Sequence, residues 1–189
     1  MDKKDLQNPA LYTNRELSWL LFNKRVLSEA RDKQLLLFER LKFLSITASN
    51  LDEFFMVRIG SLVDMIHAEY TKKDIAGMSA KEQLDALMEE THKFAALQYS
   101  TYNRMLLPQL RANGLNFVEH HEQLTERQAQ YVDEYFEENV YPVLTPMAVD
   151  SSRPFPLIRN KTLNIGALVA KKGEKDTEIE FATVQVPSV

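Results

Sequence analysis

Asn50, within the segment Ser-Asn-Leu-Asp-Glu-Phe at residues 49–54, is the side chain whose chemistry is most informative. Its carboxamide offers a hydrogen-bond donor and an acceptor, the pair needed at the N6 and N7 edge of adenine. Asparagine is also a favoured helix N-cap, with Glu53 at the spacing of a capping box. Both interpretations stay open, because a capping oxygen leaves the NH₂ group free for a base, or Ser49 could cap instead.

Asp52 and Glu53 are adjacent carboxylates, so a Mg²⁺ site or acid–base chemistry has to be considered. We favour a structural role for both in the first turn of a helix, where acidic residues complement the helix dipole. Neighbouring residues on a helix also point about 100° apart and seldom converge on one ion. For Arg58 we favour solvent or an intramolecular ion pair over a phosphate contact. We therefore predict no metal site in this chain.

No residue is predicted to act as a catalytic group. The four histidines stand on predicted helices or before one, and the sequence has no cysteine to supply a nucleophile or thiolate ligand. The phosphate-binding GxxxxGK[ST] loop, the GxGxxG turn, the HExxH helix and the GxSxG elbow are all absent from the sequence. Trp19 stands among leucines, so we interpret it as a core anchor rather than a stacking platform.

The elements that must position these residues are helices. Apolar periodicity predicts four of them, over residues 14–30, 34–45, 51–70 and 79–111, with Pro108 kinking or restarting the last. Phe54, Phe55 and Met56 are assigned to the core. Short connections between successive helices favour an antiparallel bundle. We predict an N-terminal helical domain over residues 1–114.

Local signals mark the ends of these helices. Thr13 with Glu16, and Ser79 with Glu82, have the spacing of capping boxes. Gly114 is a good helix stop, because glycine adopts the left-handed conformation at low cost.

A second, smaller α+β domain is predicted over residues 115–189. Its expected elements are a short strand at 115–118, a helix at 125–139 that Thr125 and Gln128 cap, a proline-rich connection, and a β-hairpin of strands 163–170 and 178–186 joined by a polar turn at 171–176. The last strand would lack a partner on one edge, so we expect the natural protein to continue past Val189 or another surface to cover it. The predicted fold class is mainly α with a smaller α+β part.

Charge and composition exclude several functions. The net charge is −4, and residues 76–150 carry 5 Lys+Arg against 12 Asp+Glu, which disfavours a nucleic-acid-binding domain. The sequence contains no run of 18 apolar residues, so no transmembrane helix is predicted. The first ten residues lack the apolar region of a secretory signal. The absence of cysteine is compatible with a reducing compartment.

Short sequence blocks along nearly the whole chain resemble one family, polyphosphate kinase. The blocks similar to its N-terminal helical domain lie at residues 17–20, 22–23, 39–44 and 49–54, and further blocks lie at 141–146, 154–156, 160–161, 163–164 and 184–187. The second group falls in what would be the start of the family's second, head domain.

The resemblance implies a phosphotransferase that moves the ATP γ-phosphate reversibly to inorganic polyphosphate, with Mg²⁺ and a phosphohistidine. It places Asn50 against the adenine ring of ATP and puts the catalytic residues and Mg²⁺ ligands outside this chain, so that the chain alone is expected to be inactive. ATP, ADP and polyphosphate are the implied partners of a homo-oligomer that is cytoplasmic, with possible peripheral membrane association. The alternative is a non-catalytic helical module that serves assembly or dimerisation.

Overall fold

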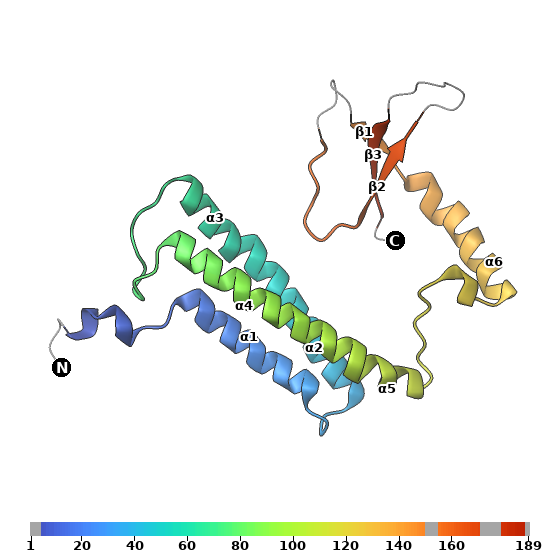
Figure 1. Cartoon of the computed structure of the whole chain (residues 1–189). Coiled ribbons are helices and arrows are strands. Elements are labelled where there is room, and N and C mark those ends of the chain that lie inside the picture. Colours follow the sequence, from blue (N-terminus) through green and yellow to red (C-terminus); the bar gives the residue numbers. More distant parts are fainter. Residues whose placement is uncertain (1–4, 150–154, 171–178, 188–189) are drawn as a thin grey trace. The chain divides into compact units, whose positions relative to one another are not determined.

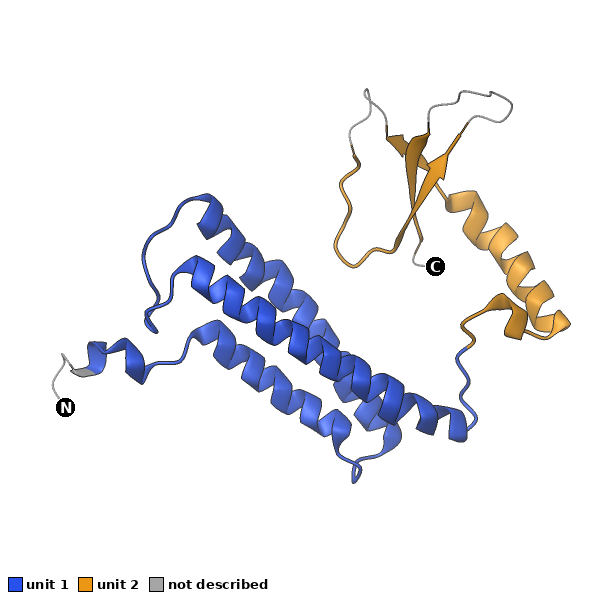
Figure 2. Ribbon diagram, viewed as in Figure 1, with its two compact units in different colours: residues 1–117 blue, residues 118–189 orange. Residues whose placement is uncertain are grey.

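The computed structural model describes residues 5–149, 155–170 and 179–187, and the chain divides into two units, residues 1–117 and 118–189 (Figure 2). The first unit holds α1 to α5 and the second holds α6 with a small sheet (Figure 1). This arrangement confirms the predicted fold class, mainly α with a smaller α+β part. Within the described ranges, no helix combines the length and apolar character needed to cross a bilayer.

The helices of the first unit pack along one another as a bundle. Their bounds are α1 Arg15–Arg31, α2 Leu37–Phe54, α3 Gly60–His67, α4 Ala80–Thr101 and α5 Leu107–Ala112. Helix α1 packs against α2 and α4, and α3 packs against α4 (Figure 1).

The predicted start of α1 is wrong by one residue. Asn14, not Thr13, caps α1, because its side-chain oxygen accepts from the backbone N–H of Leu17 at 2.9 Å. Its NH₂ group also donates to Asp74 and Gln83, so one buried carboxamide joins α1 to the loop and helix that follow α3. The capping box of Ser79 and Glu82 at α4 is confirmed.

Two separate helices were predicted, over residues 34–45 and 51–70. The structure has instead one helical run from residue 37 to residue 67. Helix α2 passes through a π-helical turn, Phe55–Ile59, into α3 without a break. The polar residues at 45–50 suggested a helix boundary, yet Thr47 is fully buried and its hydroxyl bonds back to the carbonyl of Leu44 at 2.7 Å. Thr47 and Asn50 find partners inside the bundle, so these polar residues do not need a helix end.

The prediction of one long helix that reaches residue 111 is confirmed, with an irregularity near Pro108. Helix α4 continues through a second π-helical turn, Tyr102–Leu106, into α5. Pro108 has no N–H to donate four residues back, which disturbs the regular α-helical ladder at this point. The run ends before Gly114, whose φ of +82° is the left-handed conformation expected of a helix stop.

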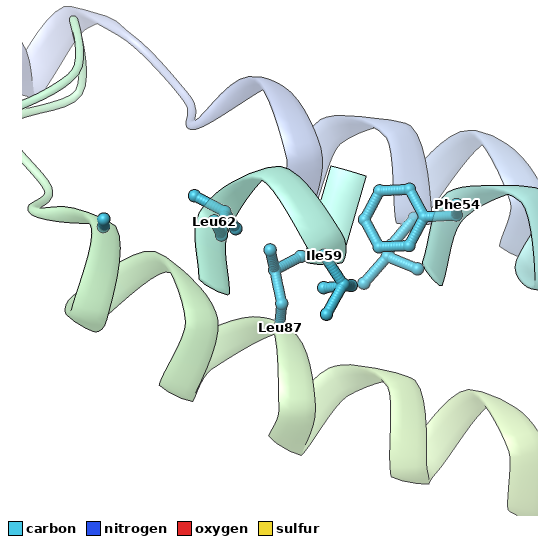
Figure 3. Packing of buried hydrophobic residues seen from close by; sticks show 6 residues of the cluster. Phe54, Ile59, Leu62 and Leu87 are labelled. Atoms are coloured by element: carbon cyan, nitrogen blue, oxygen red, sulfur yellow. The ribbon is translucent and has the colours of Figure 1, made fainter. Parts of the chain in front are cut away.

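Two apolar clusters fill the bundle. Figure 3 shows Phe54, Ile59, Leu62 and Leu87 of the first, which α1, α2, α3 and α4 contribute together with the π-helical turn. The second consists of Leu27, Ala30, Leu44, Phe94 and Leu106. Phe54 belongs to the core as predicted, whereas Phe55 and Met56 are 36% and 41% exposed, so their assignment to the core is wrong.

The second unit contains α6 (Glu126–Tyr135) and a three-stranded antiparallel sheet. Helix α6 begins at the predicted capping pair, where the backbone N–H of Thr125 donates to Gln128, and a π-helical turn extends it to Val140. The strands are β1 Met147–Val149, β2 Asn164–Val169 and β3 Glu180–Gln185, in the order β1-β3-β2.

Two predictions for the second unit change. The hairpin of β2 and β3 is confirmed, but β3 is the central strand, because β1 pairs with its other edge through Met147 and Thr183. Because prolines lie on either side of β1 in the sequence, this short strand was not predicted. Residues 115–118 form no strand. The predicted polar turn at 171–176 lies outside the described residues.

The ion pair between α1 and α4 predicts a pH dependence of stability. Hydrogen bonds from Lys24, at 2.6 Å, and Lys93 lower the pKa of Glu90 from 4.5 to about 2. A carboxylate with a lowered pKa in the folded state stabilises the fold above about pH 4.5, and this contribution is lost as the pH falls toward 2. In thermal denaturation we expect the melting temperature of the wild-type chain to fall more steeply over that range than that of Glu90→Gln.

A matched control is Asp85→Asn, because the pair of Asp85 with Lys81 is exposed and lies within α4 alone. This variant should follow the wild-type pH profile. Equal slopes for wild type and Glu90→Gln would contradict the prediction.

Candidate functional site

A pocket of about 260 Å³ opens between α1 and the junction of α2 with the first π-helical turn. It collects most of the residues that the sequence singled out. Its lining consists of Trp19 and Phe22 from α1, Asn50, Glu53 and Phe54 from α2, and Val57 and Arg58 from the turn.

One wall of the pocket is aromatic. The rings of Trp19 and Phe54 stack with a centroid separation of 4.4 Å and an interplanar angle of 8°. Phe54 is 2% exposed, and the partly buried Trp19 packs against the same core cluster, as predicted, but also faces the pocket. Because Trp19 also lines the pocket, its ring contributes to a flat apolar surface of the kind on which another aromatic ring can lie.

Asn50 lies in the interior of α2, so the interpretation as a helix N-cap is wrong. Its NH₂ group donates to Oδ1 of Asn23 on α1 at 3.1 Å, and the NH₂ group of Asn23 donates to the backbone carbonyl of Thr47 at 3.1 Å. Asn50 is half-buried at the pocket wall. Among the described residues nothing donates to its Oδ1, so this pocket-lining residue keeps an acceptor and one N–H without a protein partner.

The positive charge in the pocket lining, Arg58, is paired within the protein. Arg58 lies 3.9 Å from the carboxylate of Glu16, which is also 2.6 Å from Arg15. The predicted intramolecular ion pair of Arg58 is thereby confirmed. Glu16 is nearly buried between the two guanidinium groups, so its carboxylate offsets their charge next to the pocket.

Asp52 and Glu53 lie near the C-terminal end of α2, and their predicted position in a first helical turn is wrong. The helix begins at Leu37, so these carboxylates do not complement the positive end of its dipole. In the part of the chain that the structure describes, no group of three or more His, Asp or Glu side chains could hold a metal ion.

Asn23 is the site residue that the sequence analysis missed. It is fully buried on a stripe of α1 that Leu20, Leu27 and Ala30 continue at helical spacing. A polar residue on such an apolar stripe was the available signal, because a buried amide requires partners for its polar atoms.

The contact between the two carboxamides predicts a coupled loss of stability. Asn50→Ala leaves the buried Oδ1 of Asn23 without a donor, so we expect the free energy of unfolding to fall by about 1–3 kcal/mol. Combining it with Asn23→Leu removes both partners and should cost less than the sum of the single changes, by about 0.5–3 kcal/mol. Urea denaturation of the four proteins of this cycle measures the difference.

The control is Asn113→Ala, an exposed asparagine whose side chain donates only to the carbonyl of Gln109. Its effect should stay within about 0.5 kcal/mol. Strict additivity of the Asn23 and Asn50 changes would show that their contact contributes nothing.

Comparison with known proteins shows which family shares this sequence and fold. Residues 12–118 match the polyphosphate kinase N-terminal domain, and residues 127–189 match the polyphosphate kinase middle domain. The chain is 52% identical over 178 residues to polyphosphate kinase of Lactiplantibacillus plantarum, covering 94% of this chain and 24% of that protein. It is 48% identical over 186 residues to polyphosphate kinase of Halalkalibacterium halodurans, covering 98% and 26%.

A solved structure agrees with these matches. The crystal structure of polyphosphate kinase from Porphyromonas gingivalis aligns with a TM-score of 0.69 and 30% identity, over 92% of this chain and 25% of that one. This chain therefore spans about a quarter of the length of the relatives that it matches. With both matched segments in family order and sequence identity near half, the chain belongs to the polyphosphate kinase family.

Proposed function

We propose that this chain is the N-terminal portion of an enzyme that transfers the γ-phosphate of ATP reversibly to inorganic polyphosphate, and that its pocket holds the adenine base. The observation that carries the proposal is the half-buried carboxamide of Asn50, which keeps an acceptor and a donor available beside stacked aromatic rings. Adenine presents the complementary pair at its edge, a ring nitrogen that accepts and an amino group that donates.

The size of the pocket supports a base and not a whole nucleotide. Pockets that hold drug-sized ligands have about 300–1,000 Å³, and this one has about 260 Å³. The ribose and the phosphates would then extend beyond the residues that line it. Because Glu16 already pairs with Arg58 at the rim, we assign no phosphate contact to this arginine.

Catalysis is assigned to parts of the enzyme outside this chain. Phosphoryl transfer requires cations around the phosphates and a positioned nucleophile. The described carboxylates of the pocket region, Asp52 and Glu53, are neighbours on one helix and diverge, which does not fit a Mg²⁺ site. We propose that the Mg²⁺ ligands and the phosphorylated histidine lie elsewhere in the full-length protein, and that this chain alone has no activity.

We propose that residues 1–114 form the helical domain and residues 115–189 the start of the head domain of a homo-oligomer, in the cytoplasm with possible peripheral membrane association. Self-association is supported by the outer edge of β2, which no other described strand pairs with, and by the exposed side chains of Ile165 and Leu168 on that strand. The same features favour an assembly module as the second candidate function.

The test of the base contact is Asn50→Ala in the full-length protein that carries this segment. The change removes two neutral hydrogen bonds to adenine, worth about 0.5–1.5 kcal/mol each, so the Kd for ATP should rise roughly 5- to 150-fold. Equilibrium titration with a non-hydrolysable ATP analogue measures this effect.

The exposed-asparagine variant Asn113→Ala should bind the analogue like wild type, which controls for a general effect of the substitution. Unchanged affinity in Asn50→Ala, with the protein folded, would refute the base contact and leave assembly as the function of this segment.

A further inference from the structure

We infer that Asn23, which is too deeply buried to touch a ligand, makes the pocket select adenine over guanine by fixing the direction of the Asn50 carboxamide. The inference rests on the proposed contact between Asn50 and the base. Asn23 is thus assigned as a positioning residue that determines specificity.

The direction of the hydrogen-bond chain is fixed at one end. The backbone carbonyl of Thr47 can only accept, so the amide of Asn23 must turn its NH₂ group toward it, at 3.1 Å. Oδ1 of Asn23 therefore faces Asn50, and Asn50 must donate to it from its own NH₂ group, at 3.1 Å. Rotating Asn50 by half a turn would bring two carboxamide oxygens together next to the fully buried Asn23.

This direction decides which purine the pocket can read. Adenine carries an amino group at position 6, which donates, and guanine carries a carbonyl there, which accepts. With its NH₂ group held by Asn23, Asn50 can present Oδ1 to position 6 and its second N–H to a neighbouring ring nitrogen, which suits adenine. Against guanine, Oδ1 of Asn50 would oppose the carbonyl oxygen at position 6, whereas a reversed carboxamide would donate its N–H to that oxygen. A site that leaves polar groups unpaired rejects the wrong ligand strongly.

Residues on three helices hold this series of hydrogen bonds in place. Asn23 lies on α1, Thr47 and Asn50 lie on α2, and Gln98 of α4 donates to the hydroxyl of Thr47 at 3.0 Å. The hydroxyl of Thr47 takes no part in the chain that orients Asn50, since Asn23 bonds to the backbone of Thr47. Thr47→Val therefore removes a buried polar contact from the same cluster while leaving the orienting bonds intact.

The experiment compares ATP and GTP as phosphate donors in the full-length protein, with kcat and KM measured separately. Asn23→Leu removes the acceptor that holds Asn50, so we expect the ATP/GTP ratio of kcat/KM to fall at least tenfold, through a higher KM for ATP and a lower KM for GTP with kcat little changed. Asn23→Asp, which full burial keeps protonated, can still donate to the carbonyl of Thr47 while an oxygen faces Asn50, so it should preserve the preference. Thr47→Val should also preserve it, because lost stability alone does not change the choice of purine.

If Asn23→Leu does not fold, Asn23→Ser replaces it, since a hydroxyl can donate or accept and so no longer fixes the direction. The inference is overturned if folded Asn23→Leu or Asn23→Ser keeps the wild-type ratio, if Thr47→Val lowers the ratio equally, or if the wild-type protein does not distinguish ATP from GTP. The variant Asn50→Ala distinguishes a failure of the base contact of Asn50 from a failure of the positioning role of Asn23. A ratio unchanged in Asn50→Ala refutes the proposed contact of Asn50 with the base, whereas a ratio lowered in Asn50→Ala but not in the Asn23 variants refutes only the role of Asn23.

Discussion

The hydrogen bond between the carboxamides of Asn23 and Asn50 is the interaction on which the rest of this structure depends. It joins α1 to α2 where the pocket opens, and it continues to the backbone of Thr47 inside the bundle. Buried amides are costly when unpaired, so the two helices must keep this register for both residues to be satisfied. The same register brings Trp19 onto Phe54 and forms the aromatic wall. The polar contact and the aromatic wall of the candidate site therefore depend on the same register of α1 against α2.

The polar contact also explains why a helix runs through a segment that looks like a helix boundary. Apart from Ile46, helix α2 carries small and polar residues at 45–50 between two apolar stretches. In isolation such residues compete with the helical backbone for hydrogen bonds and favour helix ends. In the bundle, Thr47 bonds to the turn before it and accepts from Gln98. Tertiary partners therefore override the local preference, and the continuous helix keeps Asn50 in the pocket wall.

Much of the fold could be predicted from the sequence, because apolar periodicity and capping pairs are local signals. The Ser79 capping box and the antiparallel pairing of β2 with β3 are examples. Asn50 could be singled out from the sequence by its chemistry and by family resemblance, but its position within α2 could not be predicted. The partner of Asn50, Asn23, lies 27 residues away, and strand β1 is recognised only when it pairs with β3. Contacts at such separations leave no local pattern, so only the structure reveals them.

The most direct test of the central claim is a crystal structure of the full-length protein with a non-hydrolysable ATP analogue. The account predicts the adenine ring in the pocket beside Trp19, with Oδ1 of Asn50 about 3 Å from the 6-amino group and its NH₂ group still bound to Asn23. A base bound outside this pocket, or an Asn50 carboxamide turned away from the ligand, would contradict it.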